Sequence, residues 1–207
     1  MTADSRPTAI TDTNPPPRIW LLMGVSGCGK TAVGKRLAER LGATFVDADD
    51  LHPPENKAKM SAKIPLTDGD RAPWLEYLRR NVIDTTPGGQ TTVLACSTLK
   101  RAYRAVLMSG LKDIRLVYLY GSFDLISSRL AARRGHFMPP DLLQSQFATL
   151  EEPRAEEGVT VSIEGTVEEV ADRVLRSSLA QSSAVIGIPP PVESCDTAEH
   201  SPGIDRE

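Results

Sequence analysis

The fold is decided by one stretch of sequence, Ile19-Trp20-Leu21-Leu22-Met23-Gly24-Val25-Ser26-Gly27-Cys28-Gly29-Lys30-Thr31. Its first five residues are apolar, as expected for a strand that is buried on both faces. The glycine-rich turn leads into Val33, Leu37 and Leu41, which recur at helical spacing. A strand, a Gly-x-x-x-x-Gly-Lys-Thr loop and a helix in this order predict a loop whose backbone N–H groups face a phosphate.

The predicted site of a nucleoside triphosphate comprises the loop residues Gly24, Val25, Ser26, Gly27, Cys28, Gly29, Lys30 and Thr31. We expect the catalytic ammonium of Lys30 to reach the β- and γ-phosphates and the Thr31 hydroxyl to ligate Mg²⁺. Cys28 is interpreted as a small filler residue. The alternative is a glycine-rich turn that binds nothing, but the strand before the loop and the helix after it argue against that alternative.

Apolar runs alternate with helical patterns along the rest of the folded part. Strands are predicted at 19–23, 44–46, 92–95, 114–120 and 159–163, with helices between and after them. This alternation predicts a three-layer α/β/α domain around a five-stranded parallel sheet. Expected helix-end signals are Gly42, Ser122 and a capping box of Thr166 with Glu169. Pro73 is expected in the first turn of the helix that carries Trp74 and Leu78.

Length and composition exclude several function classes. A chain of 207 residues suits one domain, and 24 Lys+Arg against 27 Asp+Glu leave no basic excess for nucleic acid or a membrane surface. Three cysteines without a CxxC pair fit a reducing compartment, and no apolar run is long enough to span a bilayer, so we expect a cytoplasmic protein. Composition predicts a disordered lead at 1–17, a kinase-sized domain at 18–180 and a flexible tail at 181–207.

Three carboxylates, Asp47, Asp49 and Asp50, follow the second predicted strand. Because alternate side chains of a strand share a face, Asp47 and Asp49 are expected to point together beside the phosphate loop. We predict that Asp49 orients an acceptor hydroxyl and takes its proton, and that Asp47 lies in the water shell of the metal. The alternative is a solvated Asp-rich turn that caps the next helix.

Arginines cluster at the end of the helix after the fourth strand. Arg129 and Arg133 are one helical turn apart, and Arg134 is next to them. We expect this segment to close over the nucleotide, with Arg129 binding it and Arg133 neutralising charge on the transferred group. The alternative is a solvated basic helix end that the helix dipole favours.

The segment between Leu51 and Leu78 is polar but contains Pro, Trp and Met. His52, Lys59 and Arg71 are candidates for binding a polyhydroxylated, anionic acceptor. The alternatives are a structural role for His52 and an ion pair of Arg71 with one of the neighbouring aspartates.

The order of motifs in this segment resembles the thermoresistant type of gluconokinase. The matching runs are Asp47-Ala48-Asp49-Asp50-Leu51-His52-Pro53, Asn56-Lys57-Ala58-Lys59-Met60, Pro65-Leu66-Thr67-Asp68-Gly69-Asp70-Arg71, Pro73-Trp74-Leu75, Ala95-Cys96-Ser97-Thr98-Leu99-Lys100 with Tyr103-Arg104, and Gly135-His136-Phe137-Met138 followed by Gln146 and Leu150-Glu151-Glu152-Pro153. The resemblance extends from about Trp20 to Leu179 and covers nearly the whole folded part.

This resemblance implies a fold like that of the nucleoside monophosphate kinases and shikimate kinase, in a homodimer. It implies ATP-dependent conversion of D-gluconate to 6-phospho-D-gluconate, with Asp49 near the acceptor and Arg133 in the lid. Ser97, Lys100 and Arg104 follow the third strand and are expected to face the acceptor, although an exposed helix face is the alternative for the last two.

Two positions depart from the family pattern. Lys63 and Ala48 stand where the family usually has glycine. The departures bear on acceptor binding, because neither position touches the phosphate loop. The rival functions are a kinase for another hydroxy acid such as shikimate, or for a nucleotide, and a catalytically silent protein that binds nucleotide. The silent protein is disfavoured by the presence of Lys30, Thr31, Asp49 and Arg133.

Overall fold

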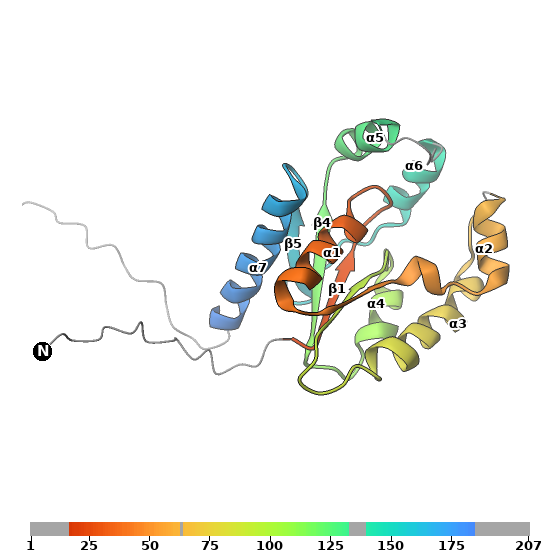
Figure 1. Cartoon of the computed structure of the whole chain (residues 1–207). Helices are drawn as coiled ribbons and strands as arrows, with labels where there is room; N and C mark the ends of the chain where they lie inside the picture. The colour runs from red at the N-terminus through yellow and green to blue at the C-terminus, as the bar shows by residue number, and fades with distance from the viewer. Residues whose placement is uncertain (1–16, 63, 133–139, 185–207) are drawn as a thin grey trace, which may run out of the picture.

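A computed structural model of the chain describes residues 17–62, 64–132 and 140–184 (Figure 1). Its centre is a sheet in which five strands lie in the order β2 (Thr44–Asp47), β3 (Thr92–Ala95), β1 (Ile19–Met23), β4 (Ile114–Tyr120) and β5 (Gly158–Ser162). Every neighbouring pair is parallel. The predicted five-stranded parallel sheet is therefore confirmed.

Helices cover both faces of this sheet (Figure 1). On one face α1 (Lys30–Leu41) packs against α7 (Val167–Ala184). On the other face lie α3 (Asp68–Leu78), the π-helical turn η2 (Arg79–Ile83) and α4 (Arg101–Met108). The 3₁₀ turn η1 (Ala48–Leu51), α2 (Pro54–Ser61), α5 (Phe123–Ala132) and α6 (Pro140–Thr149) complete the described elements. The architecture has the three layers that the sequence predicts.

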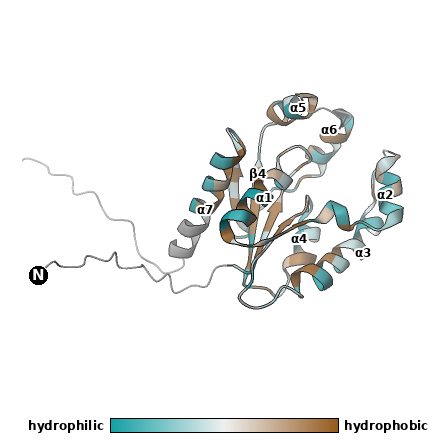
Figure 2. Ribbon diagram, viewed as in Figure 1, coloured by the Kyte–Doolittle hydropathy of each residue, from teal (hydrophilic) through white to brown (hydrophobic). Residues whose placement is uncertain are grey.

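The central strand β1 divides two apolar cores. Trp20 and Leu22 belong to the cluster beneath α1 and α7, whereas Ile19, Leu21 and Met23 belong to the cluster beneath α3 and α4. Figure 2 shows the corresponding pattern, with hydrophobic strands inside and hydrophilic residues on the outer helix faces. Because both faces of β1 are buried, its strictly apolar sequence is the sequence of a central parallel strand.

The predicted helix-end signals act as expected. Gly42 adopts a left-handed conformation with φ of 60° and ends α1. The Ser122 hydroxyl accepts a hydrogen bond from the Leu125 amide at 3.2 Å at the start of α5. Thr166 and Glu169 form the reciprocal bonds of a capping box before α7, with distances of 2.7 and 3.3 Å.

Two helix boundaries differ from the sequence prediction. The prediction that Pro73 lies in a first turn is wrong, because α3 already begins at Asp68, where Thr67 and Asp70 form a capping box. Helix α2 was not predicted; its signal is a proline in its first turn. Helix α7 continues to Ala184 and so includes the first four residues of the predicted tail.

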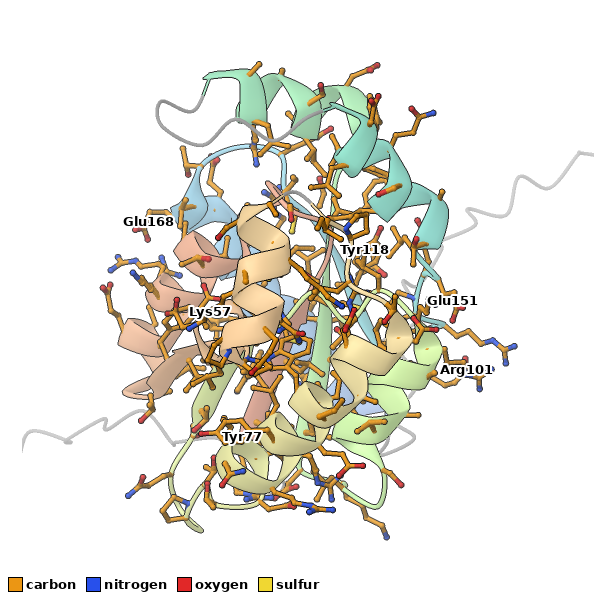
Figure 3. All side chains as sticks on the ribbon, turned by 90° about the vertical axis from the view of Figure 1, so that its right-hand side faces the viewer. Lys57, Tyr77, Arg101, Tyr118, Glu151 and Glu168 are labelled. Atoms are coloured by element: carbon orange, nitrogen blue, oxygen red, sulfur yellow. The ribbon has the colours of Figure 1, made fainter. Side chains whose placement is uncertain are left out.

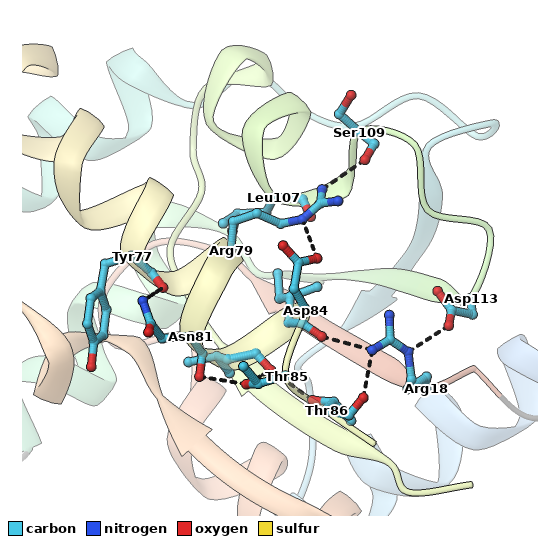
Figure 4. Close-up of polar contacts among 12 residues, drawn as sticks. Arg18, Tyr77, Arg79, Asn81, Asp84, Thr85, Thr86, Leu107, Ser109 and Asp113 are labelled. Carbon is cyan, nitrogen blue, oxygen red and sulfur yellow. Dashed lines mark hydrogen bonds and ion pairs between the residues drawn. The ribbon is translucent and has the colours of Figure 1, made fainter. Parts of the chain in front are cut away.

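Charged side chains close the end of the sheet at which the strands begin (Figure 4). Arg18 pairs with Asp113 at 2.7 Å and donates to the carbonyls of Ile83 and Thr86 at 2.9 and 2.8 Å. These bonds tie the start of β1 to η2 and to the chain before β4. Arg18 is therefore engaged in holding the layers together. Within the described residues, no helix is long and apolar enough to cross a membrane.

Candidate active site

The phosphate loop connects β1 to α1 at the carboxyl end of the sheet. Gly24 and Gly29 have φ values of 143° and 96°, which side chains other than glycine rarely adopt. A Cβ atom on Gly24 would also lie 2.7 Å from Cys28 Sγ and 2.9 Å from the Leu119 carbonyl oxygen. The Gly24 amide donates to the Ser97 carbonyl at 3.3 Å, which ties the loop to the end of β3. Glycine is therefore required for the tight path of the loop.

Lys30 begins α1 and folds back over the loop. Its Nζ donates to the carbonyl oxygens of Gly24 and Val25 at 2.9 and 3.1 Å. An ammonium group has three protons, so these two bonds leave one proton for a bound anion. The N–H groups of the first turn of α1 have no partners within the helix and add further donors at the same place.

Thr31 and Asp47 meet at the other side of the loop. The Thr31 hydroxyl donates to Asp47 Oδ2 at 2.8 Å, and Asp47 Oδ1 accepts from the Asp49 amide at 3.2 Å. A hydroxyl and a carboxylate are oxygen ligands that suit Mg²⁺. Among the described residues, no three His, Cys, Asp or Glu side chains are grouped to hold a metal. A magnesium ion at Thr31 and Asp47 would therefore complete its coordination with phosphate oxygens and water.

The carboxyl group of Asp49 lies beside this pair at the end of β2. Desolvation raises its pKa, the carboxylates of Asp47 and Asp50 raise it further, and the positive charge of Lys30 opposes them. A carboxylate with a raised pKa is a better proton acceptor than an ordinary aspartate. Asp47 and Asp49 thus lie together near the phosphate loop, but the predicted strand alternation is not the reason, because β2 ends at Asp47 and Asp49 belongs to η1.

A cavity of about 370 Å³ adjoins the loop on the side of α7. It is lined by Cys28, Gly29, Val33, Arg129, Ile163, Gly165, Thr166, Val167 and Val170. The Arg129 guanidinium donates to the carbonyls of Ile163 and Gly165 at 2.9 and 3.3 Å, and so joins α5 to the turn before α7. This cavity is largely apolar and open, and it has the size of a small planar ring system with a sugar.

The predicted acceptor residues from η1 and α2 make internal contacts. His52 is buried and stacks on Trp74, with ring centroids 3.8 Å apart, and its Nδ1 lies 3.3 Å from Asn56 Nδ2. Burial and the charges of Arg71 and Lys57 lower the pKa of His52 to about 4, so the ring is neutral at pH 7. Its role in this structure is to pack η1 on α3.

Lys59 and Arg71 lie on facing helices. Lys59 Nζ donates to Asp70 Oδ1 at 2.6 Å, and this bond with those from Thr67 lowers the pKa of Asp70 to about 2. Arg71 donates to the Leu66 carbonyl, and its guanidinium carbon is 5.9 Å from the centre of the Tyr103 ring. Arg71 therefore does not pair with either neighbouring aspartate at hydrogen-bond distance.

Lys100 pairs with a carboxylate at the start of α3. Its Nζ lies 2.8 and 2.7 Å from the two oxygens of Asp68, which also accepts from the Tyr103 hydroxyl. These bonds lower the pKa of Asp68, with that from Lys100 contributing most. Ser97, two residues after the end of β3, is half-buried, and its carbonyl accepts from the Gly24 amide.

Arg104 occupies neither of the two predicted environments. It is only 2% exposed, so the alternative of an exposed helix face is wrong. Its guanidinium donates to the Glu151 carbonyl at 2.8 Å and to Glu157 Oε2 at 2.9 Å. A guanidinium engaged in this way joins α4 to the chain after α6, which does not support the predicted contact with an acceptor.

Comparisons with known proteins match this arrangement. The model of the family described as "Shikimate kinase" matches residues 26–184. A mouse protein named "Probable gluconokinase" is 45% identical over 179 residues, which cover 78% of this chain and 97% of that protein. The gluconokinase of Gluconobacter oxydans strain 621H is 45% identical over 166 residues, with 80% and 93% covered. A crystal structure of a gluconokinase from Sinorhizobium meliloti 1021 is 39% identical, with a TM-score of 0.74 over 84% of this chain and 98% of that one.

The chain belongs to the gluconokinase family. Its fold is that of the P-loop kinases, as the match to the shikimate kinase model also indicates, so the predicted fold class and the predicted family are both confirmed. Members of the gluconokinase family are kinases, and the predicted enzyme class, a phosphotransferase, is confirmed with them.

The gluconokinase-family site has parts that lie outside the described residues. These are the predicted lid residue Arg133, its neighbour Arg134 and the family departure Lys63. The second departure, Ala48, is buried at the start of η1, and its carbonyl accepts from Trp74 Nε1 at 3.1 Å. Sequence reasoning did not assign roles to Asp68, Tyr103 or Gln146, although all three stand within the runs that carry the family resemblance.

Proposed function

We propose that this protein transfers the γ-phosphoryl group of ATP to D-gluconate and forms 6-phospho-D-gluconate. One observation carries the proposal: Asp47 accepts hydrogen bonds from the Thr31 hydroxyl and the Asp49 amide, at 2.8 and 3.2 Å. This contact ties the backbone of Asp49 to the residue that binds Thr31, and the charge of Lys30 acts on the Asp49 carboxyl group. A proton acceptor beside a triphosphate site is the arrangement that a small-molecule kinase requires.

The nucleotide half of the site has a place for each part of ATP. We infer that the cavity beside Arg129 receives the adenosine and that the loop from Gly24 to Thr31 receives the phosphates. Mg²⁺ held by Thr31 and Asp47, when bound, supplies positive charge that offsets the charge of the phosphates. Lys30 has one proton left for a phosphate oxygen, since its other two are used by carbonyls.

The acceptor half orients one primary hydroxyl of the sugar acid. Asp49 accepts the hydrogen bond of this hydroxyl and takes its proton as the oxygen forms a bond to the γ-phosphorus. The bond between that phosphorus and the bridging oxygen of ADP breaks in the same step. Because phosphoryl transfer has a loose transition state, Asp49 acts mainly by positioning the hydroxyl.

The remaining groups of gluconate require cations and hydroxyl partners. The segment between η1 and α4 carries the cations Lys59, Arg71 and Lys100, which are proposed to bind these groups of gluconate. Ser97 and His52 stand at the border of this segment. We further propose that Arg133 adds positive charge to the transferred group, as the family resemblance implies. Arg104 is proposed to act only by holding the chain after α6.

Two properties of the whole protein are also proposed. The described cysteines Cys28 and Cys96 are free thiols, both buried, which supports a reducing compartment such as the cytoplasm. The family resemblance supports a homodimer, and size-exclusion chromatography with light scattering measures this directly.

The function is tested by ADP release with Mg·ATP across a panel of acids that includes gluconate, other aldonates and shikimate. The variant Asp49→Asn is assayed alongside, with the neighbouring Asp50→Asn, which is exposed as Asp49 is, as the matched control. We expect gluconate to be the best acceptor, and Asp49→Asn to lower kcat about 10³-fold, within the range for loss of a general base. Turnover of shikimate without turnover of gluconate would contradict the substrate assignment. ATP binding without turnover of any acid would favour the silent binding protein.

A further inference from the structure

Gln146 on α6 forms hydrogen bonds with the phosphate loop, although it has no role in the proposed chemistry. Its side-chain oxygen accepts from the Ser26 amide at 2.7 Å, and its Nε2 donates to Ser26 Oγ at 3.1 Å. Both ends of the carboxamide are thus satisfied by one residue of the loop. Pairing both polar ends of a half-buried amide to a single partner fixes the direction of that partner as well as its distance.

The peptide that Gln146 binds is also the peptide that holds Lys30. Its N–H belongs to Ser26 and is taken by Gln146, while its carbonyl belongs to Val25 and accepts from Lys30 Nζ at 3.1 Å. A peptide unit is planar, so fixing the direction of its N–H fixes the direction of its carbonyl. The orientation of the Lys30 ammonium therefore depends on the carboxamide of Gln146.

Helix α6 is a firm support for this contact. Leu143 and Phe147, on either side of Gln146 in the sequence, belong to the same apolar cluster as Val25 and Cys28 of the loop. Helical spacing lets the three α6 residues share the side that faces the loop. The apolar contacts hold the helix in place, and Gln146 adds the polar contact that is specific for one loop conformation.

The chain after α6 is anchored to the loop by a second route. The Glu151 amide donates to the Leu99 carbonyl at 2.9 Å, and its carboxylate accepts from the Arg101 amide at 2.6 Å. Figure 3 shows Glu151 and Arg101 side by side at the start of α4. The same connection between β3 and α4 contains Ser97, whose carbonyl accepts from Gly24. The first part of the glycine-rich turn is thus bonded to neighbouring elements at Gly24 and at Ser26.

We propose that Gln146 is a positioning residue, which locks the Val25–Ser26 peptide so that Lys30 faces the phosphates before ATP binds. The inference rests on the proposed function, because it assigns to Lys30 the role of a phosphate ligand. Preorganised donors gain affinity by avoiding rearrangement on binding. Loss of the carboxamide leaves the Val25–Ser26 peptide with the 3.3 Å bond from the Cys28 amide to the Val25 carbonyl, so the direction of Lys30 is less firmly fixed while the fold of the loop is kept by its glycines.

The test is a calorimetric titration of a non-hydrolysable ATP analogue with Mg²⁺, without any acceptor. Gln146→Met keeps the length of the side chain, and Gln144→Met, at an exposed position of the same helix, is the matched control. We expect the Kd to rise about 10-fold in Gln146→Met, which corresponds to about 1.4 kcal/mol, and less than about 2-fold in the control. In turnover assays kcat is expected to fall as well, with the KM for gluconate unchanged.

A double-mutant cycle separates this role from a merely structural one. In a Lys30→Met background, Gln146→Met is expected to change the Kd less than about 2-fold, because the lysine it positions is gone. Ser26→Ala removes only the bond to Nε2 and is expected to raise the Kd about 2- to 3-fold, which tests the contact should Gln146→Met fail to fold. An unchanged Kd in Gln146→Met, or an equal loss with and without Lys30, would overturn the inference. A wild-type protein that fails to bind the analogue would instead contradict the proposed function.

Discussion

The phosphate loop and the acceptor segment hold their cations in opposite ways. Lys30 in the loop contacts two neutral carbonyls. Lys59 and Lys100 in the acceptor segment each contact a carboxylate of the protein, Asp70 and Asp68, at 2.6 and 2.7 Å. A phosphate that enters the loop therefore meets an ammonium group whose hydrogen bonds within the described residues go to carbonyls and not to a carboxylate, although the Asp49 carboxylate lies near enough for its charge to act on Lys30. A sugar acid that enters the acceptor segment has to compete with protein carboxylates.

This difference in cation partners explains how one small domain can bind its two substrates in different ways. Exposed ion pairs contribute little to stability, so exchange of Asp68 for a substrate carboxylate has a small energetic cost. The same exchange also yields only a small net gain in binding free energy. The hydroxyl groups of the acceptor therefore have to provide the rest of the affinity. The comparison predicts tight, preorganised binding of ATP and weaker but more selective binding of the acid.

The largest effect is expected at the cation without a charged partner. Lys30→Met should lower kcat/KM about 10³-fold, since it removes a donor aimed at the transferred phosphoryl group. Lys35→Met, at an exposed position on the same helix, should change it less than about 2-fold. Steady-state turnover of both variants measures the contrast. A loss below 10-fold in Lys30→Met would break the comparison, because the loop cation would then be no more important than a surface lysine.

Arg104 provides the next largest effect, and it is an effect on stability. Arg104→Met should lower the free energy of unfolding by about 3 kcal/mol, because it leaves Glu157 without its buried partner. Arg101→Met removes a more exposed, 3.4 Å contact to the same carboxylate and should cost less than about 1 kcal/mol. Chemical denaturation measures both values. A raised KM for gluconate with unchanged stability would instead restore Arg104 to the acceptor site.

Lys100 tests the acceptor side of the comparison. Lys100→Met should raise the KM for gluconate about 30-fold and leave the KM for ATP within about 2-fold, as expected for one lost charged hydrogen bond to the acid. Lys112→Met, an exposed lysine before β4, is the control. Equal changes in both KM values would show that the two halves of the site are not separable in this way.

The smallest effect, a change in the pH dependence of stability, is expected for His52. Unlike the charged lysines around it, His52 is a neutral residue that packs against its neighbours. Its pKa in the folded protein, about 4, is below the usual 6.5, so the unfolded chain takes up the proton first as pH falls. Stability from the neutral ring is present above pH 6.5 and is lost as pH falls toward 4. Between pH 6.5 and 5, wild type should lose about 1 kcal/mol more unfolding free energy than His52→Gln. Identical pH profiles would mean that His52 is not held neutral by its surroundings.

The sequence predicts the nucleotide half well because its signals are local. The strand, the glycines, Lys30 and Thr31 are contiguous, and Asp47 reaches Thr31 across only 16 residues. Asp47 and Asp49 are also close in sequence, but the reason for their proximity differs from the predicted strand alternation, because β2 ends at Asp47 and Asp49 lies in the turn η1 that Asp47 caps. The parallel sheet follows in the same manner, since each strand and each helix end carries its own pattern.

The acceptor half is less predictable because its contacts are distant in sequence. Lys100 and Asp68 are 32 residues apart, and Arg104 and Glu157 are 53 apart. No periodicity selects one carboxylate among many as the partner of a given cation. Sequence reasoning therefore identified both Lys100 and Arg104 as functional candidates. In the structure, Lys100 forms a half-exposed ion pair, whereas Arg104 forms a buried one.

The most direct test of the central claim identifies the product made from gluconate and ATP. Phosphorus NMR of the reaction mixture, with coupling to protons retained, reports which carbon carries the new phosphate. The account predicts a single new phosphomonoester whose phosphorus couples to the two protons of a primary carbon, formed together with an equal amount of ADP. Release of inorganic phosphate alone, or a phosphoester on a secondary carbon, would contradict it.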